Sequence, residues 1–324
     1  MGARDLDLAR AGDEAAFAEL VRPHTRELQL HCYRMLGSFT DAEDLLQETL
    51  TAAWRGLPGF EGSSSLRTWL YAIATNRCLN AIRAAKRRPP AEPVPPFVPP
   101  PPSRRGEVTW LQPYPDALLD QLPDDAPGPA ARYQLRESVE LAFIVALQRL
   151  PPRQTAAIIL CDVLGFSLAE AATMLGTGAT AIKGLLQRAR AGLDGSFEPS
   201  TAPAVDTPQQ RDLVRRFAHA FSAGDVDGVI ALLTDDAWLA MPPAPHEYHG
   251  REAIAAFLRV STTERVLGGW RLRLSPTRAN RQPAFDCRLV ESDTGEELPA
   301  GQLVLTLRGD RIRALARFLI DVPE

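Results

Sequence analysis

A run of prolines divides this chain. Nine of the fourteen residues from Pro89 to Pro102 are proline. Proline lacks a backbone N–H and fixes φ, so the run cannot continue a helix or enter the middle of a sheet. Further prolines follow as far as Pro129, and a second break rich in Pro, Thr and Ala spans 198–208. The 324-residue chain is therefore predicted to hold three folded blocks, joined by a linker that we interpret as a spacer; the blocks are 8–88, 131–195 and 208–324, and the linker is 89–130.

Charge is distributed unevenly over these segments. The formal net charge is −4, yet residues 1–88 hold 12 Lys and Arg against 11 Asp and Glu, and residues 131–195 hold 7 against 5. The linker holds 2 against 6, and residues 196–324 hold 15 against 18. The first two blocks are therefore the ones expected to meet a phosphate backbone locally, with a basic run at Lys86–Arg88.

Cysteine spacing and hydropathy indicate a cytoplasmic protein. Four cysteines lie far apart without a CxxC pair, which is typical of reduced thiols and not of a disulfide framework or zinc cluster. We expect no membrane span, because no run of about 18 apolar residues occurs. His246-Glu247-Tyr248-His249 places its histidines three apart beside prolines, so we expect no metal site there.

The first block reads as helical. From Asp41 onward, Leu46, Leu50, Ala53 and Trp54 share one face while Asp44 and Glu48 lie opposite. After a Gly/Ser loop, a second helix is predicted from about Leu66 to Lys86, with Asn76, Asn80, Arg83 and Arg87 on one stripe. The acidic stripe is either a face that docks a partner protein or a face that is exposed only to solvent. Trp69 is a stacking platform for an unpaired base or part of the core.

The second block contains a helix-turn-helix pattern. Ser167 and Glu170 form the capping box that begins a helix, and Gly176 supplies a left-handed turn residue. A second helix after Thr177 buries Ile182, Leu186, Ala189 and Leu193. Its outward residues are suited to base edges and phosphates in the major groove; they are Thr180, Lys183, Gln187 and Arg190.

The third block changes from helical to strand periodicity. Helices are predicted at 212–223 and 251–260, followed by strands at 270–274 and 303–307 and a turn at 308–311, which together indicate an α+β domain with an antiparallel sheet. Aromatic and polar side chains in this block are candidates for a ligand pocket, although most aromatic residues at such spacing form core. The candidate pocket residues are Trp238, Met241, His246, Tyr248 and Trp270.

These motifs together carry a resemblance. Residues 32–37, 41–49, 53–54 and 66–77 resemble region 2 of the extracytoplasmic-function sigma factors of RNA polymerase, and residues 150–154 and 182–190 resemble their region 4. Block three resembles the cone-shaped, SnoaL-like NTF2 fold that a subset of these factors carries, as in the SigG-like group. The resemblance implies two all-α sigma domains, a helical bundle and a helix-turn-helix, followed by an α+β NTF2-like domain.

The resemblance also implies roles for individual residues in a factor that is not an enzyme, needs no cofactor and directs promoter-specific initiation. Region 2 would bind the clamp helices of the polymerase β′ subunit through Asp41, Asp44, Gln47 and Glu48. It would melt and read the −10 element through Ser63, Ser64, Arg67, Trp69, Asn76, Arg77, Asn80 and Arg83. Region 4 would meet the β flap and read the −35 element through Thr180, Lys183, Gln187, Arg188 and Arg190. Gly184 and Leu185 stand where many members have Ser-Arg.

The linker and the third block leave alternatives open. The linker would thread through the polymerase, where Asp116, Asp120, Asp124 and Asp125 could mimic nucleic acid. The third block would modulate activity, and a small ligand is a candidate partner for it. The rival hypotheses are a ligand-responsive helix-turn-helix regulator that acts without polymerase, and an isomerase or hydrolase in block three.

Overall fold

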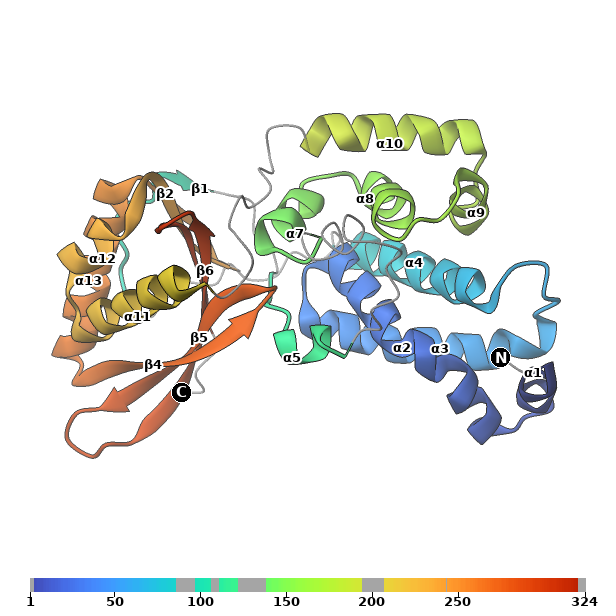
Figure 1. Cartoon of the computed structure of the whole chain (residues 1–324), viewed down its shortest axis with the longest axis horizontal. Helices are drawn as coiled ribbons and strands as arrows, with labels where there is room; N and C mark the ends of the chain where they lie inside the picture. The colour runs from blue at the N-terminus through green and yellow to red at the C-terminus, as the bar shows by residue number, and fades with distance from the viewer. Residues whose placement is uncertain are drawn as a thin grey trace. The chain divides into compact units, whose positions relative to one another are not determined.

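The computed structural model describes residues 3–85, 97–105, 111–121, 138–193, 207–242 and 244–319 (Figure 1). The chain forms two compact units, each assembled from two stretches of sequence. The first unit combines Met1–Pro89 with Ala117–Glu198, and the second combines Pro90–Asp116 with Pro199–Glu324. The second unit therefore contains part of the predicted linker as well as the third block, which the proline pattern does not indicate.

Residues 3–85 fold into four α-helices: α1 (Ala3–Arg10), α2 (Glu14–Leu36), α3 (Phe39–Gly56) and α4 (Leu66–Ala85). Side-chain oxygens of Asp13 and Ser38 accept backbone N–H groups at the starts of α2 and α3, and Gly37 ends α2 at φ 74°. The predicted boundaries of the helix from Leu66 to Lys86 agree with those of α4 up to Ala85. A shared core lies between α2, α3 and α4, with fully buried Leu28, Tyr33, Ala53, Leu70 and Tyr71.

Residues 138–193 form the helix-turn-helix and the helices that support it. These are α7 (Leu141–Gln148), α8 (Pro152–Ile158), the wider turn η2 (Ile159–Val163), α9 (Leu168–Met174) and α10 (Ala179–Leu193). The predicted capping box is confirmed, because Ser167 and Glu170 exchange both hydrogen bonds, and Gly176 has the expected left-handed φ of 59°. Within this unit α9 packs on α4, and α10 packs on α8 and α9 (Figure 1).

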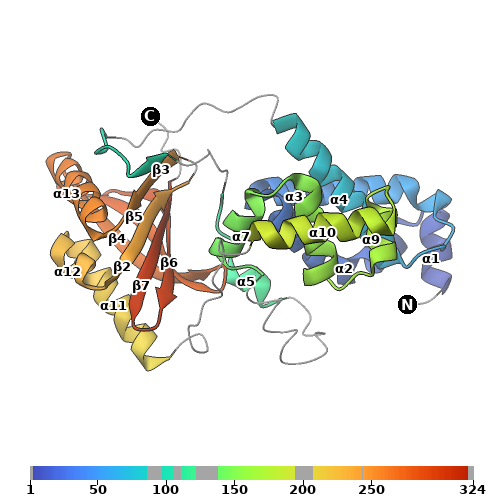
Figure 2. The ribbon, with the colours of Figure 1, turned by 90° about the horizontal axis from the view of Figure 1, so that it is seen from above.

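The second unit is a sheet with helices on one face (Figure 2). Its helices are α11 (Pro208–Ala223), α12 (Val226–Ala231) and α13 (Arg251–Leu267). Its strands are β2 (Leu233–Met241), β3 (Ala244–His249), β4 (Trp270–Ala279), β5 (Gln282–Glu291), β6 (Glu297–Arg308) and β7 (Arg311–Phe318). One core cluster joins helices and sheet and includes Phe217, Leu239, Phe257, Phe285 and Leu305. The expected α+β, NTF2-like architecture is confirmed.

Two features of the sheet depart from the sequence-based expectation. The strand order is β1-β3-β2-β7-β6-β5-β4, and β2 pairs with β7 in parallel, so the sheet is mixed and not wholly antiparallel. The edge strand β1 (Arg104–Arg105) comes from the linker and pairs with β3. The predicted turn at 308–311 is confirmed as a tight connection between β6 and β7 with Gly309 at φ 62°. No helix in the described ranges is long and apolar enough to cross a membrane.

Candidate nucleic-acid interface

The acidic face of α3 is exposed along its length. Asp44 and Glu48 lie one turn apart, and the same helix buries Leu45 and Leu46 on its other side. The exposed members of this face are Asp41, Asp44, Gln47 and Glu48. Glu48 lies 3.3 Å from Nη1 of Arg77 on α4, and both side chains remain about half exposed. Such a pair contributes little stability, so the face remains open to a partner.

The loop before α4 holds the two candidate serines. Ser63 is exposed and Ser64 half-buried, while the next residue, Ser65, accepts the backbone N–H of Thr68 at 3.0 Å and caps α4. Trp69 packs on Phe60, with ring centroids 4.9 Å apart. A Cβ at Gly56 would lie 3.2 Å from the same indole. Trp69 is therefore held half-buried against its own domain.

The polar stripe of α4 is exposed as far as the structure describes it, and Arg87, the last residue predicted for the stripe, lies outside the described residues. Asn76, Arg77, Asn80 and Arg83 all face solvent, and Arg83 donates to Oδ1 of Asn80 at 3.1 Å. Asn76 is different, because its side-chain amide donates to the carbonyl of Met174, at the end of α9, at 3.2 Å. One of the candidate base-reading residues is thus in contact with the helix-turn-helix.

Arg67 is held in place by a carboxylate and two aromatic rings. Its Nε donates to Oε2 of Glu27 at 3.2 Å, and its guanidinium lies 4.9 Å from the ring centroid of Tyr71 and 4.6 Å from that of Phe166. Burial by itself would raise the pKa of Glu27, but the hydrogen bond from His24 and the charge of Arg67 outweigh it and hold that pKa below its ordinary value. The cation is therefore paired and stacked inside the first unit.

Sequence reasoning missed the residues that cover α4. Phe166 precedes α9, and Glu170 of the capping box also accepts the hydroxyl hydrogen of Thr68 through Oε1 at 3.2 Å. The capping box predicts that Glu170 caps α9, but it does not predict the contact of Glu170 with Thr68. Nothing in the sequence indicates the contact of Phe166 with Arg67, because the two residues belong to different blocks.

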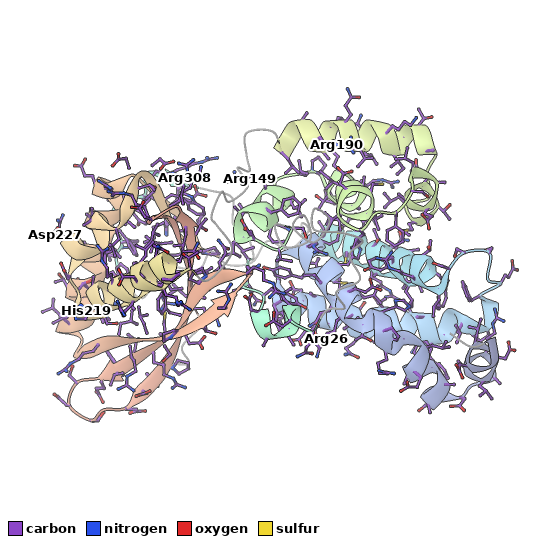
Figure 3. All side chains as sticks on the ribbon, viewed as in Figure 1. Arg26, Arg149, Arg190, His219, Asp227 and Arg308 are labelled. Carbon is purple, nitrogen blue, oxygen red and sulfur yellow. The ribbon has the colours of Figure 1, made fainter. Side chains whose placement is uncertain are left out.

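The second helix of the helix-turn-helix, α10, exposes the residues predicted to lie outward, and Figure 3 labels Arg190 on it. Arg190 forms two hydrogen bonds with the carboxylate of Asp162, at 2.8 and 2.9 Å. Gly184 lies beneath Arg188, whose Nη1 would be 3.4 Å from a Cβ there. The other four predicted residues of this helix, Thr180, Lys183, Gln187 and Arg188, are also exposed.

The five candidate pocket residues of the third block do not gather. Met241, His246 and Tyr248 are buried, whereas Trp238 alternates onto the opposite face of β2 and stacks on His249 at 6.4 Å. Trp270 begins β4, the edge strand at the opposite end of the sheet from β1 and β3. A hollow between α11, α12 and α13 is lined by other residues, among them Phe221, Thr262 and Arg265.

A segment of the linker is anchored to the β4–β5 turn. The backbone N–H of Tyr114 donates to Oδ1 of Asn280 at 2.8 Å, and the N–H of Asn280 donates to the carbonyl of Tyr114 at 2.9 Å. Asp116 is buried, accepts the backbone N–H of Arg281 at 2.7 Å and pairs with Nε of Arg278 at 3.0 Å. Asp116 is thus bound within the second unit. Asp124 and Asp125 lie outside the described residues.

Three family models match three successive parts of the chain. Models of sigma-70 region 2, sigma-70 region 4 and a SnoaL-like domain match residues 20–88, 140–193 and 214–314. The chain is 42% identical to the ECF RNA polymerase sigma factor SigG of Mycobacterium tuberculosis over 321 residues, covering 96% of this chain and 82% of that protein. It is 28% identical to SigJ of the same species over 252 residues, covering 76% and 72%.

One solved structure shares the fold over nearly the whole chain. The crystal structure of the Mycobacterium tuberculosis extracytoplasmic function sigma factor SigJ superposes with a TM-score of 0.59 at 22% identity, covering 95% of this chain and 97% of that one. At this identity the likeness concerns the fold alone.

Proposed function

The chain belongs to the extracytoplasmic-function sigma factors of RNA polymerase, and from that premise we propose which of its surfaces makes each contact. Members of this family are transcription initiation factors without enzymatic activity, and they bind core RNA polymerase and promoter DNA. The observation that carries the assignment is the separate exposure of an acidic face on α3 and of polar and basic faces on α4 and α10. We place the protein in the cytoplasm, where the polymerase acts.

The acidic face of α3 is the proposed site for the β′ clamp helices. Asp41, Asp44, Gln47 and Glu48 present carboxylates and an amide on one side of a helix that is fixed from behind by Leu45 and Leu46. Exposed carboxylates of this kind favour a basic partner surface and speed its association. Region 4 is proposed to meet the β flap.

The proposed −10 interface consists of the loop before α4 and the exposed stripe of that helix. Asn80 and Arg83 are exposed and hydrogen-bonded to each other, whereas Arg67 and Asn76 touch Phe166 and Met174. Arginine and amide side chains suit phosphates and base edges in an opened duplex. Reading the −10 element with all of these residues requires that α9 first leave α4.

The proposed −35 interface is α10 in the major groove. Lys183, Gln187 and Arg188 follow one another at helical spacing on its exposed side. Lys and Arg suit phosphates or guanine, and Gln suits adenine. Arg190 enters this role only by giving up Asp162.

The SnoaL-like domain is proposed to modulate activity by holding the linker. Tyr114 and Asp116 are both buried and bonded to the β4–β5 turn through Asn280, Arg281 and Arg278. A linker held in this way has fewer conformations available for a path through the polymerase. Release of the anchor would therefore change how readily the factor forms holoenzyme.

Transcription with purified components tests the main assignment. Core polymerase supplied with this chain is expected to initiate from promoters selected by crosslinking of the holoenzyme to genomic fragments, and core polymerase alone is not. Failure on every selected promoter together with no binding to core polymerase would contradict the proposal. Tight binding to duplex DNA in the absence of polymerase would favour the regulator hypothesis instead.

Deletion of residues 208–324 tests the modulating role. The shortened chain is expected to bind core polymerase and to initiate at an altered rate. Loss of core binding on deletion, with the remaining helices still folded by circular dichroism, would contradict a modulating appendage. Substrate turnover by the full chain that ends when cavity residues are replaced would favour the enzyme hypothesis.

A further inference from the structure

The proline run has a defined conformation where the structure describes it. In Pro99–Pro102 each ring fixes φ near −65°, and each residue before a proline is pushed to extended ψ, so sterics impose a polyproline II helix. Residues 98–102 accordingly form neither α-helix nor strand. Val98 and Pro101, three apart, are exposed, while Pro99, Pro100 and Pro102 are half-buried. That spacing is the three-residue repeat of the polyproline II helix.

Two aromatic side chains of the SnoaL-like domain contact this segment. Tyr248 of β3 and Phe257 of α13 have ring centroids 4.7 Å apart, and the ring of Phe97 lies 5.7 Å from that of Phe257. Phe97 is packed against the core of the domain. The hydroxyl of Tyr248 donates to the carbonyl oxygen of Pro100 at 2.8 Å. Because prolines lack an N–H, their carbonyls are the free backbone groups that such a donor can recognise.

The hydroxyl of Tyr248 is suited to that donor role. The side chain is 1% exposed, and burial raises the pKa of its phenol. It therefore stays protonated at neutral pH. Its ring packs on Phe257 while its polar end reaches the peptide, which combines apolar contact and backbone recognition in one residue.

The segment then continues as an added strand. The backbone N–H of His249 donates to Oγ of Ser103 at 3.1 Å, and Arg104 and Arg105 pair with β3 opposite Glu247 and His246. Addition of an extended peptide to a sheet edge supplies backbone hydrogen bonds without regard to sequence. The position of Arg104 opposite an acid adds a preference for a basic residue there.

We propose that the SnoaL-like domain is a binding module for proline-rich peptides, and that residues 97–105 are its resident ligand. The recognised pattern is an aromatic residue, then a polyproline II stretch, Pro99–Pro102, whose second residue accepts the bond from Tyr248, then a basic strand along β3. This assigns the domain a ligand class that does not depend on its effect on transcription. It also gives the proline run a role beyond that of a spacer.

Peptide binding to the full-length chain tests the proposal. The probe is a fluorescent peptide of the sequence of residues 97–105, FVPPPPSRR, and the variant Phe97→Asp releases the resident segment, and so vacates its site, by placing a charge where the ring packs. The vacated variant is expected to bind the peptide saturably. The unchanged chain should bind it at least about tenfold more weakly, because a tethered segment competes at a high effective concentration. A peptide with its four prolines replaced by Gly and Ser should bind about tenfold more weakly than the probe, because it must lose more conformational freedom.

Tyr248→Phe supplies the matched control. In the Phe97→Asp background it removes one hydrogen bond to the peptide and should weaken binding about fivefold. Absence of saturable binding to a vacated variant that retains its near-ultraviolet circular dichroism would overturn the proposal. Equal affinity for the Gly/Ser peptide would also overturn it.

A second measurement does not need the vacated variant. Trypsin should cleave the Tyr248→Phe chain after Arg104 or Arg105 about fivefold faster than the unchanged chain, because the segment detaches more often. Equal cleavage rates in chains of equal thermal stability would show that the segment is not held through Tyr248. Neither assay contains polymerase or promoter, so their failure would leave the sigma-factor assignment standing, and failure of transcription would leave peptide binding standing.

Discussion

The guanidinium of Arg67 lies 4.6 Å from the ring centroid of Phe166, so a residue of the proposed −10 interface stacks on the approach to the helix-turn-helix. The hydrogen bonds from Thr68 to Glu170 and from Asn76 to Met174 follow the same line along α4. Three residues of α4, the helix of the proposed −10 interface, are thus in contact with the helix-turn-helix or the residue that precedes it. Under the proposed function, promoter recognition by both elements exchanges these contacts for contacts with DNA.

A double-mutant cycle measures that stacking. Arg67→Gln and Phe166→Leu should each destabilise the first unit, and their combined effect should fall short of the sum by about 0.5–1 kcal/mol, the energy of a partly exposed cation–π contact. Urea unfolding followed by circular dichroism provides the free energies. Strict additivity would show that the two side chains do not interact in solution.

Charge reversal on α3 tests the proposed clamp-binding face. Asp44→Arg with Glu48→Arg should weaken binding to core polymerase at least about tenfold, because two attractive contacts become repulsive. The fold should survive, since the Glu48–Arg77 pair is exposed and worth at most about 1 kcal/mol. Fluorescence titration against core polymerase measures the affinity. Asp5→Arg with Asp7→Arg, an equal change in charge at two exposed sites on α1, is the control and should have a much smaller effect.

Two basic residues of α10 should behave differently. Lys183→Ala is expected to weaken −35 binding by the holoenzyme and to reduce the slope of log affinity against log salt by about 1, because Lys183 is exposed and suited to a phosphate. Arg190→Ala should change the slope little, since its guanidinium is bound to Asp162. Salt titrations of promoter binding distinguish the two. An equal loss of slope for both would mean that Arg190 leaves Asp162 on DNA.

The buried histidine of α2 predicts a pH dependence of stability. Burial, with smaller contributions from Arg34 and Arg67, lowers the pKa of His31 to about 3, and its Nε2 lies 2.9 Å from Oγ1 of Thr75. In the unfolded chain the His31 imidazole therefore takes up a proton as the pH falls through about 6.5, whereas in the folded chain it stays neutral down to about pH 3. The resulting stability is complete above about pH 6.5 and falls by up to about 1.4 kcal/mol per pH unit as the pH decreases toward 3.

The variant His31→Gln isolates this contribution. Its free energy of unfolding should be lower at pH 7 but should fall less steeply than that of the unchanged chain between pH 6.5 and 5. Urea unfolding at several pH values measures both slopes. Identical slopes would mean that His31 is not buried in its neutral form.

The β4–β5 turn holds the linker at a conformational cost. Asn280 and Arg281 have φ values of 55° and 60°, a geometry for which glycine is preferred at the second position. Arg281→Gly should raise the stability of the second unit by about 1 kcal/mol and keep the N–H that Asp116 accepts. Asp116→Asn should lower it by about 2 kcal/mol, because it removes the charge from a buried bond to Arg278. Calorimetry of the full chain measures both the expected gain in stability for Arg281→Gly and the expected loss for Asp116→Asn.

Local rules in the sequence determined most of the elements. The capping box at Ser167 and Glu170, the left-handed Gly176 and the alternation of apolar and acidic residues along α3 act within a few residues of one another, and the structure confirms each. For the same reason the exposed stripes of α3, α4 and α10 could be named in advance. Steric rules likewise determined the extended form of Pro99–Pro102.

Tertiary structure alone decided what those elements touch. Thr68 meets Glu170 across 102 positions and Tyr248 meets Pro100 across 148, and contacts at such separation leave no periodic trace in the sequence. The candidate pocket residues were divided between faces and edges of the sheet because strand order and pairing, which are not local, assign each side chain its neighbours. The proline run depends both on local sequence rules and on tertiary structure. Its conformation follows from covalent sterics, but its binding site exists only because β3 and α13 come together.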